Sequence, residues 1–285
     1  ANEKTAMGEA LGMSYVGRRA MVCMKHVGLN VAADAFVNSG MTGANGGLVV
    51  VVADDPSMHS SQNEQDSRFY GAFAFIPVFE PSTQQEAYDM VRAAFDHSER
   101  FRIPVLMRLT TRMAHSRAAV EIAEPRPENP LDYPENPRQW VLMPGNSRVR
   151  YTALIDDYAR MEEADVESPF NRCTDGADKR LGIIACGIAY NYLMENYPEG
   201  CPCPVLKVSQ YPLPRRLVRH LAAECQELLV IEEGQPLVEQ ALRGVLPAAQ
   251  KIRGRLTGEL PRTGELTPDS VRAALGLAPH RAHAA

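Results

Sequence analysis

The residues best suited to do chemistry in this chain follow a short run of valines. Valines occupy positions 49–52, and residues 53–68 then bring acidic side chains, a histidine, an arginine and several amides. Four consecutive valines predict a strand buried on both faces, as in a parallel sheet covered by helices. Ligands of open α/β sheets collect at the carboxyl ends of such strands, so this segment is a candidate site. A solvated connection between a strand and a helix is an equally good interpretation.

The first part of the chain is expected to position this segment. Helices are expected over residues 4–16, 29–37 and 84–101, and strands over 20–24, 48–53, 75–79 and 103–109. Strands that alternate with helices predict a parallel sheet with right-handed crossovers.

The second part begins after a proline-rich stretch. Prolines 125, 127, 130, 134, 137 and 144 predict an extended surface connector, because proline removes amide donors and blocks helix. A helix over 151–164 is expected next, then strands over 181–187, 205–208 and 228–231 with helices over 188–196, 215–224 and 237–246. The predicted fold class is α/β, with two parallel-sheet domains and helices on both faces. The expected boundaries are 1–123, 124–178 for the connector and its helix, 179–276, and a tail at 277–285.

Composition narrows the function classes. The chain has 285 residues and a formal charge of -5, without a basic run, which argues against nucleic acid as a partner. No apolar run approaches the length of a membrane span, so neither membrane nor export is expected and we predict a cytoplasmic protein. Six dispersed cysteines suit reduced thiols. The spacing of Cys201 and Cys203 differs from Cys-x-x-Cys, and no metal site is predicted. Neither GxGxxG nor a Walker A motif is present.

Several segments resemble one enzyme family. Residues 2–6, 24–34, 46–56, 59–66, 110–112, 115–117, 182–190 and 232–234 are similar to the alpha subunit of indolepyruvate:ferredoxin oxidoreductases, which are thiamine-diphosphate-dependent 2-oxoacid oxidoreductases. The resemblance implies a pyrimidine-binding domain that lacks its first strand and helix, followed by a transketolase C-terminal-like domain. It also implies an internal fragment or one piece of a split subunit, without the diphosphate-binding domain and its Gly-Asp metal motif. Activity of the isolated chain is therefore doubtful.

The resemblance assigns the catalytic role to Glu3. In this family a glutamate of the pyrimidine-binding domain hydrogen-bonds the aminopyrimidine ring of the cofactor and favours the tautomer that takes the thiazolium proton. Glu3 matches that position. From the residues alone, the better explanation of an acid in the first turn of a helix is its favourable interaction with the helix dipole.

Other candidates form a second group. Lys25 and His26 follow the predicted strand at 20–24 and are expected to bind the cofactor region, where a cation pair could hold a 2-oxoacid carboxylate. A satisfied loop histidine is the alternative for His26. Arg68 is a candidate for binding the substrate carboxylate, with an i,i+4 pair to Glu64 as its alternative. The remaining candidates for the substrate pocket are His59 and Asn63.

The function that the resemblance implies is oxidative decarboxylation of arylpyruvates such as indolepyruvate to acyl-CoA, with ferredoxin as electron acceptor. Another 2-oxoacid of the pyruvate type and a non-catalytic α/β interaction module are the alternatives. Thiamine diphosphate with Mg²⁺ is the expected cofactor, and iron–sulfur clusters and coenzyme A are expected only in the complete enzyme. The expected partners are a diphosphate-binding domain or subunit, a beta-type subunit, ferredoxin and further copies in an oligomer.

We also expect residues 54–68, with Lys25 and His26, to form an interface that is mobile until it is covered.

Overall fold

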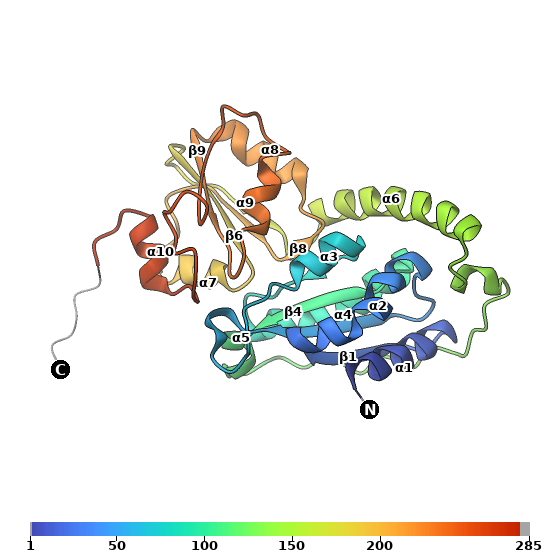
Figure 1. Cartoon of the computed structure of the whole chain (residues 1–285). Helices are drawn as coiled ribbons and strands as arrows, with labels where there is room; N and C mark the ends of the chain where they lie inside the picture. Colours follow the sequence, from blue (N-terminus) through green and yellow to red (C-terminus); the bar gives the residue numbers. More distant parts are fainter. Residues whose placement is uncertain (1, 280–285) are drawn as a thin grey trace.

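Two five-stranded sheets organise the part of the chain that the structure, a computed structural model, describes (residues 2–279; Figure 1). The first sheet has the order β1-β2-β4-β3-β8 and the second the order β10-β9-β6-β7-β5. Most neighbouring strands are parallel, as expected. The pairs β3–β8 and β5–β7 are antiparallel, which the alternating pattern did not predict.

The first sheet is built almost entirely by the first half of the chain. Its strands are β1 (Ala20–Lys25), β2 (Leu48–Asp54), β3 (Val78–Phe79), β4 (Val105–Thr110) and β8 (Gln210–Tyr211). The helices of this half are α1 (Glu3–Tyr15), α2 (His26–Thr42), α3 (Arg68–Ala74), α4 (Gln84–Phe101) and α5 (Thr111–His115), with short 3₁₀ turns η1 (Pro56–Met58) and η2 (Pro137–Trp140). Strand β8 comes from the second half, so that half also contributes an edge to the first sheet.

The second sheet follows the long helix α6 (Pro144–Val166), which runs from the far end of the first unit back to the second (Figure 1). Its strands are β5 (Arg172–Thr174), β6 (Leu181–Cys186), β7 (Val205–Val208), β9 (Glu227–Ile231) and β10 (Lys251–Arg253). Its helices are α7 (Ala189–Met194), α8 (Arg215–Glu224), α9 (Leu237–Leu242) and α10 (Pro268–Ala274). None of the described helices is long and apolar enough to cross a membrane.

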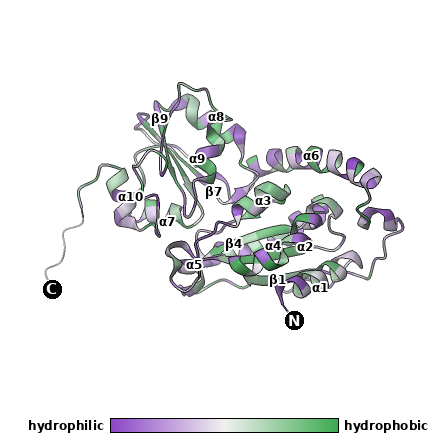
Figure 2. Ribbon diagram, in the orientation of Figure 1, coloured by the Kyte–Doolittle hydropathy of each residue, from purple (hydrophilic) through white to green (hydrophobic). Residues whose placement is uncertain are grey.

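Helices cover both faces of each sheet, which confirms the predicted fold class. In the first sheet, Val50 and Val52 pack toward α1 and α2, whereas Val49 packs toward α4. In the second sheet, Ile184 faces the side of α8 and α9, and Ile183 faces α7 and α10. Strand β4 is coloured mainly as hydrophobic in Figure 2, as expected for a strand buried on both faces.

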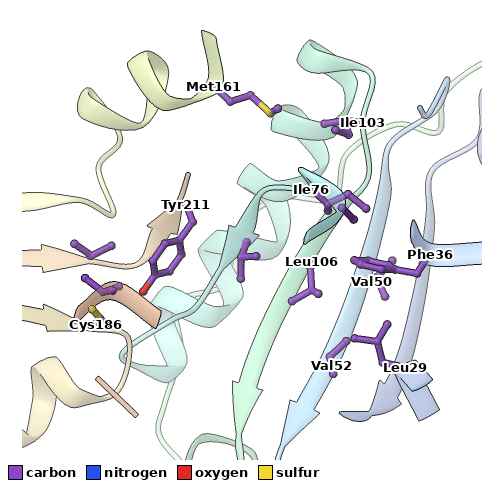
Figure 3. Packing of buried hydrophobic residues seen from close by; sticks show 14 of the residues in the cluster. Leu29, Phe36, Val50, Val52, Ile76, Ile103, Leu106, Met161, Cys186 and Tyr211 are labelled. Carbon is purple, nitrogen blue, oxygen red and sulfur yellow. The ribbon is translucent and has the colours of Figure 1, made fainter. Parts of the chain in front are cut away.

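One apolar cluster joins the two units. It runs from Phe36 on α2 through Leu106 on β4 to Tyr211 on β8 and Cys186 on β6 (Figure 3). Met161 on α6 belongs to the same cluster and is fully buried. Because burial of apolar area is the main favourable term in folding, this shared core fixes the second unit against the first.

Local sequence signals explain where several elements start and stop. Helix α4 has the predicted bounds because the Thr83 side chain accepts a hydrogen bond from the backbone N–H of Glu86, a standard N-cap. The strand expected over 75–79 is confined to β3. Phe75 instead ends α3 in the left-handed conformation (φ 56°), and Pro77 has no amide donor for a ladder. Helix α6 begins at Pro144, seven residues before the predicted start, because proline is favourable in a first turn.

Candidate functional site

Three neighbouring strands of the first sheet end at the same edge, and each leads into polar residues. Lys25 pairs with Ala53, and Asp54 pairs with Thr110, so β1, β2 and β4 finish in register. Because the strands are parallel, their carboxyl ends bring together residues that are far apart in the sequence. The candidate site predicted after the valine run therefore lies at the carboxyl edge of the first sheet.

Lys25 and His26 hold the loop that follows β2. His26 is 1% exposed; its Nδ1 lies 3.3 Å from the carbonyl oxygen of Ala53 and its Nε2 lies 3.1 Å from that of Asn63. The Nζ of Lys25 lies 3.2 Å from the carbonyl oxygen of Ser60 and keeps part of its surface exposed. His26 is thus used for positioning the loop, which is the alternative raised for it, while Lys25 remains an accessible cation. Asn63 contributes its backbone to this contact, and its side chain is exposed.

Glu3 reaches the same edge from α1. A Cβ atom built on Gly28 would lie 2.7 Å from Cγ and 3.0 Å from Oε1 of Glu3. The Glu3 side chain therefore rests directly on the first turn of α2, where only glycine leaves room for it. Since α2 begins at His26, immediately after β1, the Glu3 side chain lies close to the start of α2, where Lys25 and His26 are found. That these three residues share a cofactor site stays a prediction.

Replacing Gly28 by alanine is expected to displace the Glu3 carboxylate and to leave the fold intact. Alanine suits a helix better than glycine by up to about 1 kcal/mol, so the backbone effect of the substitution should favour folding and offset part of the cost of crowding Glu3. The carboxyl ¹³C chemical shift of Glu3 in the NMR spectrum should change. The matched control is Gly8→Ala on α1, where no heavy atom lies within 4 Å of the added Cβ. An unchanged Glu3 resonance in Gly28→Ala would contradict the close approach.

Asp55 organises the loop from within. Its carboxylate accepts hydrogen bonds from the backbone N–H of His59 (3.2 Å) and Ser60 (2.9 Å) and from the hydroxyls of Ser61 and Thr111 (both 2.6 Å). Burial would raise the pKa of Asp55, but these donors outweigh it and hold the pKa well below its usual range. Hydrogen bonds within the chain therefore hold the base of this loop. That the loop is an interface, mobile until it is covered, stays a prediction.

Arg68 lies in a different place from the one expected of a substrate-binding residue. Its side chain is 0% exposed, and its guanidinium donates to Asp66 at 2.5 Å and to Glu232 at 2.9 Å. It also donates to the carbonyl oxygens of Glu233 (3.1 Å) and Gln235 (2.7 Å), which belong to the second unit. With its donors engaged and no exposed surface, Arg68 cannot meet a substrate in this conformation. Arg68 therefore links the two units and does not have the accessible position that was expected of a substrate-binding residue.

The alternative partner suggested for Arg68 is also wrong. Helix α3 begins at Arg68, so Glu64 precedes the helix and cannot form an i,i+4 pair on it. The carboxylate of Glu64 instead accepts a hydrogen bond from the backbone N–H of Ser57 at 2.9 Å.

Arg108 completes a buried set of charges between the units. This arginine sits inside β4 and donates to Asp54 at 2.6 Å, to Glu80 at 2.9 Å and to the carbonyl oxygen of Glu233 at 3.1 Å. We call this set the buried ion cluster; its members are Asp54, Asp66, Arg68, Glu80, Arg108, Glu232 and Glu233. It joins the carboxyl edge of the first sheet to the end of β9. Breaking one partner of such a network leaves an uncompensated buried charge.

The cluster shifts the pKa values of its carboxyl groups in opposite directions. Burial raises the pKa of Asp66, but the guanidiniums of Arg108 and Arg68 outweigh it and hold the pKa at about 2. Burial raises the pKa of Glu233 to about 7, against the opposing effect of Arg255. Asp66 is therefore ionised at neutral pH, whereas the pKa of Glu233 lies close to neutral pH.

A pocket of about 310 Å³ opens beside this cluster, at the end of β4. The pocket is lined by residues of α5 and the residue directly after it: Thr111, Arg112, His115 and Ser116. His59 from the loop and Glu265 from the second unit complete the lining. Arg112 donates to both carboxylate oxygens of Glu265, at 2.8 and 2.7 Å. His59 lies in this pocket, with its Nε2 3.4 Å from Glu265, and its role in binding a substrate stays a prediction.

Sequence reasoning missed several of these residues as site components. Arg108 interrupts the apolar strand Val105–Thr110, and a charge inside a buried strand signals a buried partner. The Glu232 and Glu233 pair directly follows the buried strand β9, which is the same signal. Arg112 lies in one of the segments that resemble the family (residues 110–112), but the sequence analysis gave it no role. Nothing in the local sequence points to Glu265, which lies 153 residues from Arg112.

Comparisons with known proteins identify the family of the chain. Residues 1–165 match the family model described as pyruvate flavodoxin/ferredoxin oxidoreductase, thiamine diphosphate-binding. The chain is 40% identical to the indolepyruvate oxidoreductase subunit IorA of Archaeoglobus fulgidus over 99% of the chain and 46% of that protein. It is 41% identical to the IorA subunit of Pyrococcus abyssi over 93% of the chain and 43% of that protein. The chain thus spans about half the length of the curated relatives it matches.

Solved structures show the same fold at low sequence identity. A 2-oxoglutarate:ferredoxin oxidoreductase from Magnetococcus marinus matches with a TM-score of 0.69 and 14% identity, over 96% of this chain and 56% of that one. A split-gene transketolase matches with a TM-score of 0.60 and 20% identity, over 97% of this chain and 81% of that one. Because the family model covers more than half of the sequence, including Glu3, Lys25 and His26, the chain belongs to the pyruvate flavodoxin/ferredoxin oxidoreductase family through its thiamine-diphosphate-binding domain.

Proposed function

We propose that the chain forms part of a 2-oxoacid:ferredoxin oxidoreductase of the indolepyruvate type and supplies the pyrimidine-facing side of its thiamine diphosphate site. The observation that carries this proposal is the Glu3 side chain, which lies against Gly28 at the edge where Lys25 and His26 meet. The identity of 40% to an IorA subunit over nearly the whole chain supports the indolepyruvate assignment. The proposed reaction is oxidative decarboxylation of an arylpyruvate to an acyl-CoA, with ferredoxin as electron acceptor.

The residues at this edge fit the pyrimidine end of the cofactor. Glu3 is partly exposed, and the absence of a side chain at Gly28 lets the Glu3 side chain lie against the first turn of α2. Thiamine diphosphate supplies the nucleophilic carbon and electron sink that the side chains of proteins lack. In this proposal the carboxyl of Glu3 holds a proton at the aminopyrimidine ring nitrogen, and Lys25 offers a positive charge to the acidic substrate.

The other end of the cofactor needs ligands from elsewhere. Among residues 2–279, no group of three or more His, Cys, Asp or Glu side chains is placed to hold a metal ion. We propose that the phosphates and Mg²⁺ are held by a diphosphate-binding domain or subunit outside this sequence. A beta-type subunit, iron–sulfur clusters and the coenzyme A site would complete the oligomeric enzyme.

Two measurements test the proposal. Calorimetric titration of the chain alone with thiamine diphosphate and Mg²⁺ should show weak binding or none, because only one end of the cofactor is provided for. The chain combined with polypeptides that carry the diphosphate-binding domain, the iron–sulfur clusters and the beta-type subunit should reduce ferredoxin with indolepyruvate and coenzyme A. Micromolar affinity of the lone chain would refute the divided cofactor site. If the assembled enzyme reduced ferredoxin with neither indolepyruvate nor pyruvate, the proposed oxidoreductase activity would be refuted. A preference for pyruvate would replace indolepyruvate as the proposed substrate.

A further inference from the structure

The pocket at the end of β4 contains a cation whose geometry suits a carboxylate ligand. The Nε and Nη2 atoms of Arg112 donate to the two oxygens of one carboxylate, that of Glu265, at 2.8 and 2.7 Å. This two-point arrangement is the one with which arginine recognises a carboxylate. Unlike Arg68, whose side chain is 0% exposed, the Arg112 side chain is 49% exposed. A ligand can therefore reach Arg112.

The surroundings of Arg112 add imidazole rings that can bind a second group on such a ligand. His59 and His115 line the same pocket of about 310 Å³, together with Thr111 and Ser116, whose hydroxyls already donate to Asp55 and to the carbonyl oxygen of Met113. A carboxylate held by Arg112 would place a neighbouring carbonyl oxygen among these groups. The pocket therefore has the chemistry to hold a small carboxylic acid that carries a polar group beside its carboxyl.

The pocket is also connected to the edge that holds Glu3. Thr111 donates to the Oδ1 atom of Asp55 at 2.6 Å, and the Nζ of Lys25 lies 3.9 Å from Oδ2 of the same residue. Asp55 thus bridges the end of β4 and the end of β1. A ligand bound at Arg112 would lie along the same carboxyl edge as the proposed cofactor residues.

Glu265 is held in place by the second unit. It follows Gly264 in the loop before α10, and the next residue, Leu266, donates its backbone N–H to the buried carboxylate of Glu233 at 3.1 Å. The Glu265 carboxylate occupies the Arg112 fork in the way that a ligand would. Because the Arg112–Glu265 pair is partly exposed to water, it is the kind of ion pair that a competing anion can displace.

We propose that Arg112 is the anchor of a binding site for the carboxylate of a small 2-oxoacid, and that Glu265 occupies this site as an internal competitor when no ligand is bound. The identification of the ligand as a 2-oxoacid rests on the proposed function, whereas the carboxylate site itself does not. The proposal assigns to Arg112 the role that the sequence suggested for Arg68.

The test uses the full chain, with phenylpyruvate as the probe in calorimetric titrations and in NMR spectra of the His59 and His115 rings. Glu265→Gln, which keeps the size of the side chain but removes its charge, should bind phenylpyruvate about tenfold more tightly than the unaltered chain, a difference of about 1.4 kcal/mol. Glu265→Ala should behave in the same way, and circular dichroism checks that both variants fold. Adding Arg112→Gln to Glu265→Gln should abolish the gain, whereas Arg117→Gln, which removes an exposed charge from the neighbouring chain, should preserve it.

Each other outcome overturns the proposal. If the Glu265 variants bind no more tightly than the unaltered chain, or if no variant binds, Glu265 and Arg112 form a structural contact only. Binding that survives Arg112→Gln would place the carboxylate elsewhere. The assembled enzyme separates this proposal from the proposed function: turnover that is unaffected by Arg112→Gln would refute the substrate site and leave the oxidoreductase standing. Binding of phenylpyruvate at Arg112 in an assembled enzyme that shows no turnover would support the carboxylate site and refute the oxidoreductase.

Discussion

Replacement of Arg68 by methionine is expected to lower the free energy of unfolding by about 3–5 kcal/mol, the cost of removing one partner from a buried ion pair. Arg68 has no exposed surface, and its guanidinium faces the carboxylates of Asp66 and Glu232 and two carbonyl groups of the second unit. Methionine keeps much of the apolar volume but leaves these anions and acceptors without their donor. Urea unfolding followed by circular dichroism measures the difference.

A surface arginine provides the matched control for Arg68. Arg216 forms ion pairs with Glu163 and Glu167, but its side chain is 59% exposed. Exposed pairs contribute about 0–1 kcal/mol, so Arg216→Met should change stability by no more than that. Equal effects of the two substitutions would show that the buried ion cluster does not link the units. A loss of ligand binding without a loss of stability in Arg68→Met would return Arg68 to the list of substrate-binding residues.

Substitution of Glu3 by glutamine should reduce turnover of the assembled enzyme by about 10²–10⁴-fold, the usual contribution of a positioned acid or base. Glutamine retains the size and much of the hydrogen bonding of glutamate, but it lacks the carboxyl proton that the proposed role requires. Assembly and stability should not change, since Glu3 is partly exposed and lies in the first turn of α1. Steady-state reduction of ferredoxin with indolepyruvate measures the effect.

Glu9→Gln is the control for this experiment. Glu9 lies on the same helix, is exposed, and loses the same charge when it is substituted. Its turnover should match that of the unaltered enzyme. Normal oxidation of indolepyruvate by Glu3→Gln would remove Glu3 from the mechanism, whereas an equal loss in both variants would point to a general effect of charge on assembly.

Local patterns in the sequence determined most of the elements. The valine run gave the buried strand β2, and the bounds of α4, α8 and β7 coincide with their predictions. These elements are predictable because hydrophobic periodicity, capping residues and prolines act within a few residues of one another. The parallel order of the strands then implied that Lys25, His26 and the loop after β2 share one edge, and the structure agrees.

Tertiary structure alone decided which charges are buried and which remain accessible. Arg68 and Glu232 are 164 residues apart, and Arg112 and Glu265 are 153 residues apart. An arginine next to a polar loop looks the same in the sequence whether it faces solvent or the interior. Only the docking of the second unit, with β8 added to the first sheet and the turn after β9 placed on its edge, closes Arg68 off and leaves Arg112 half exposed. Contacts across such separations depend on how the units pack, and no local periodicity records them.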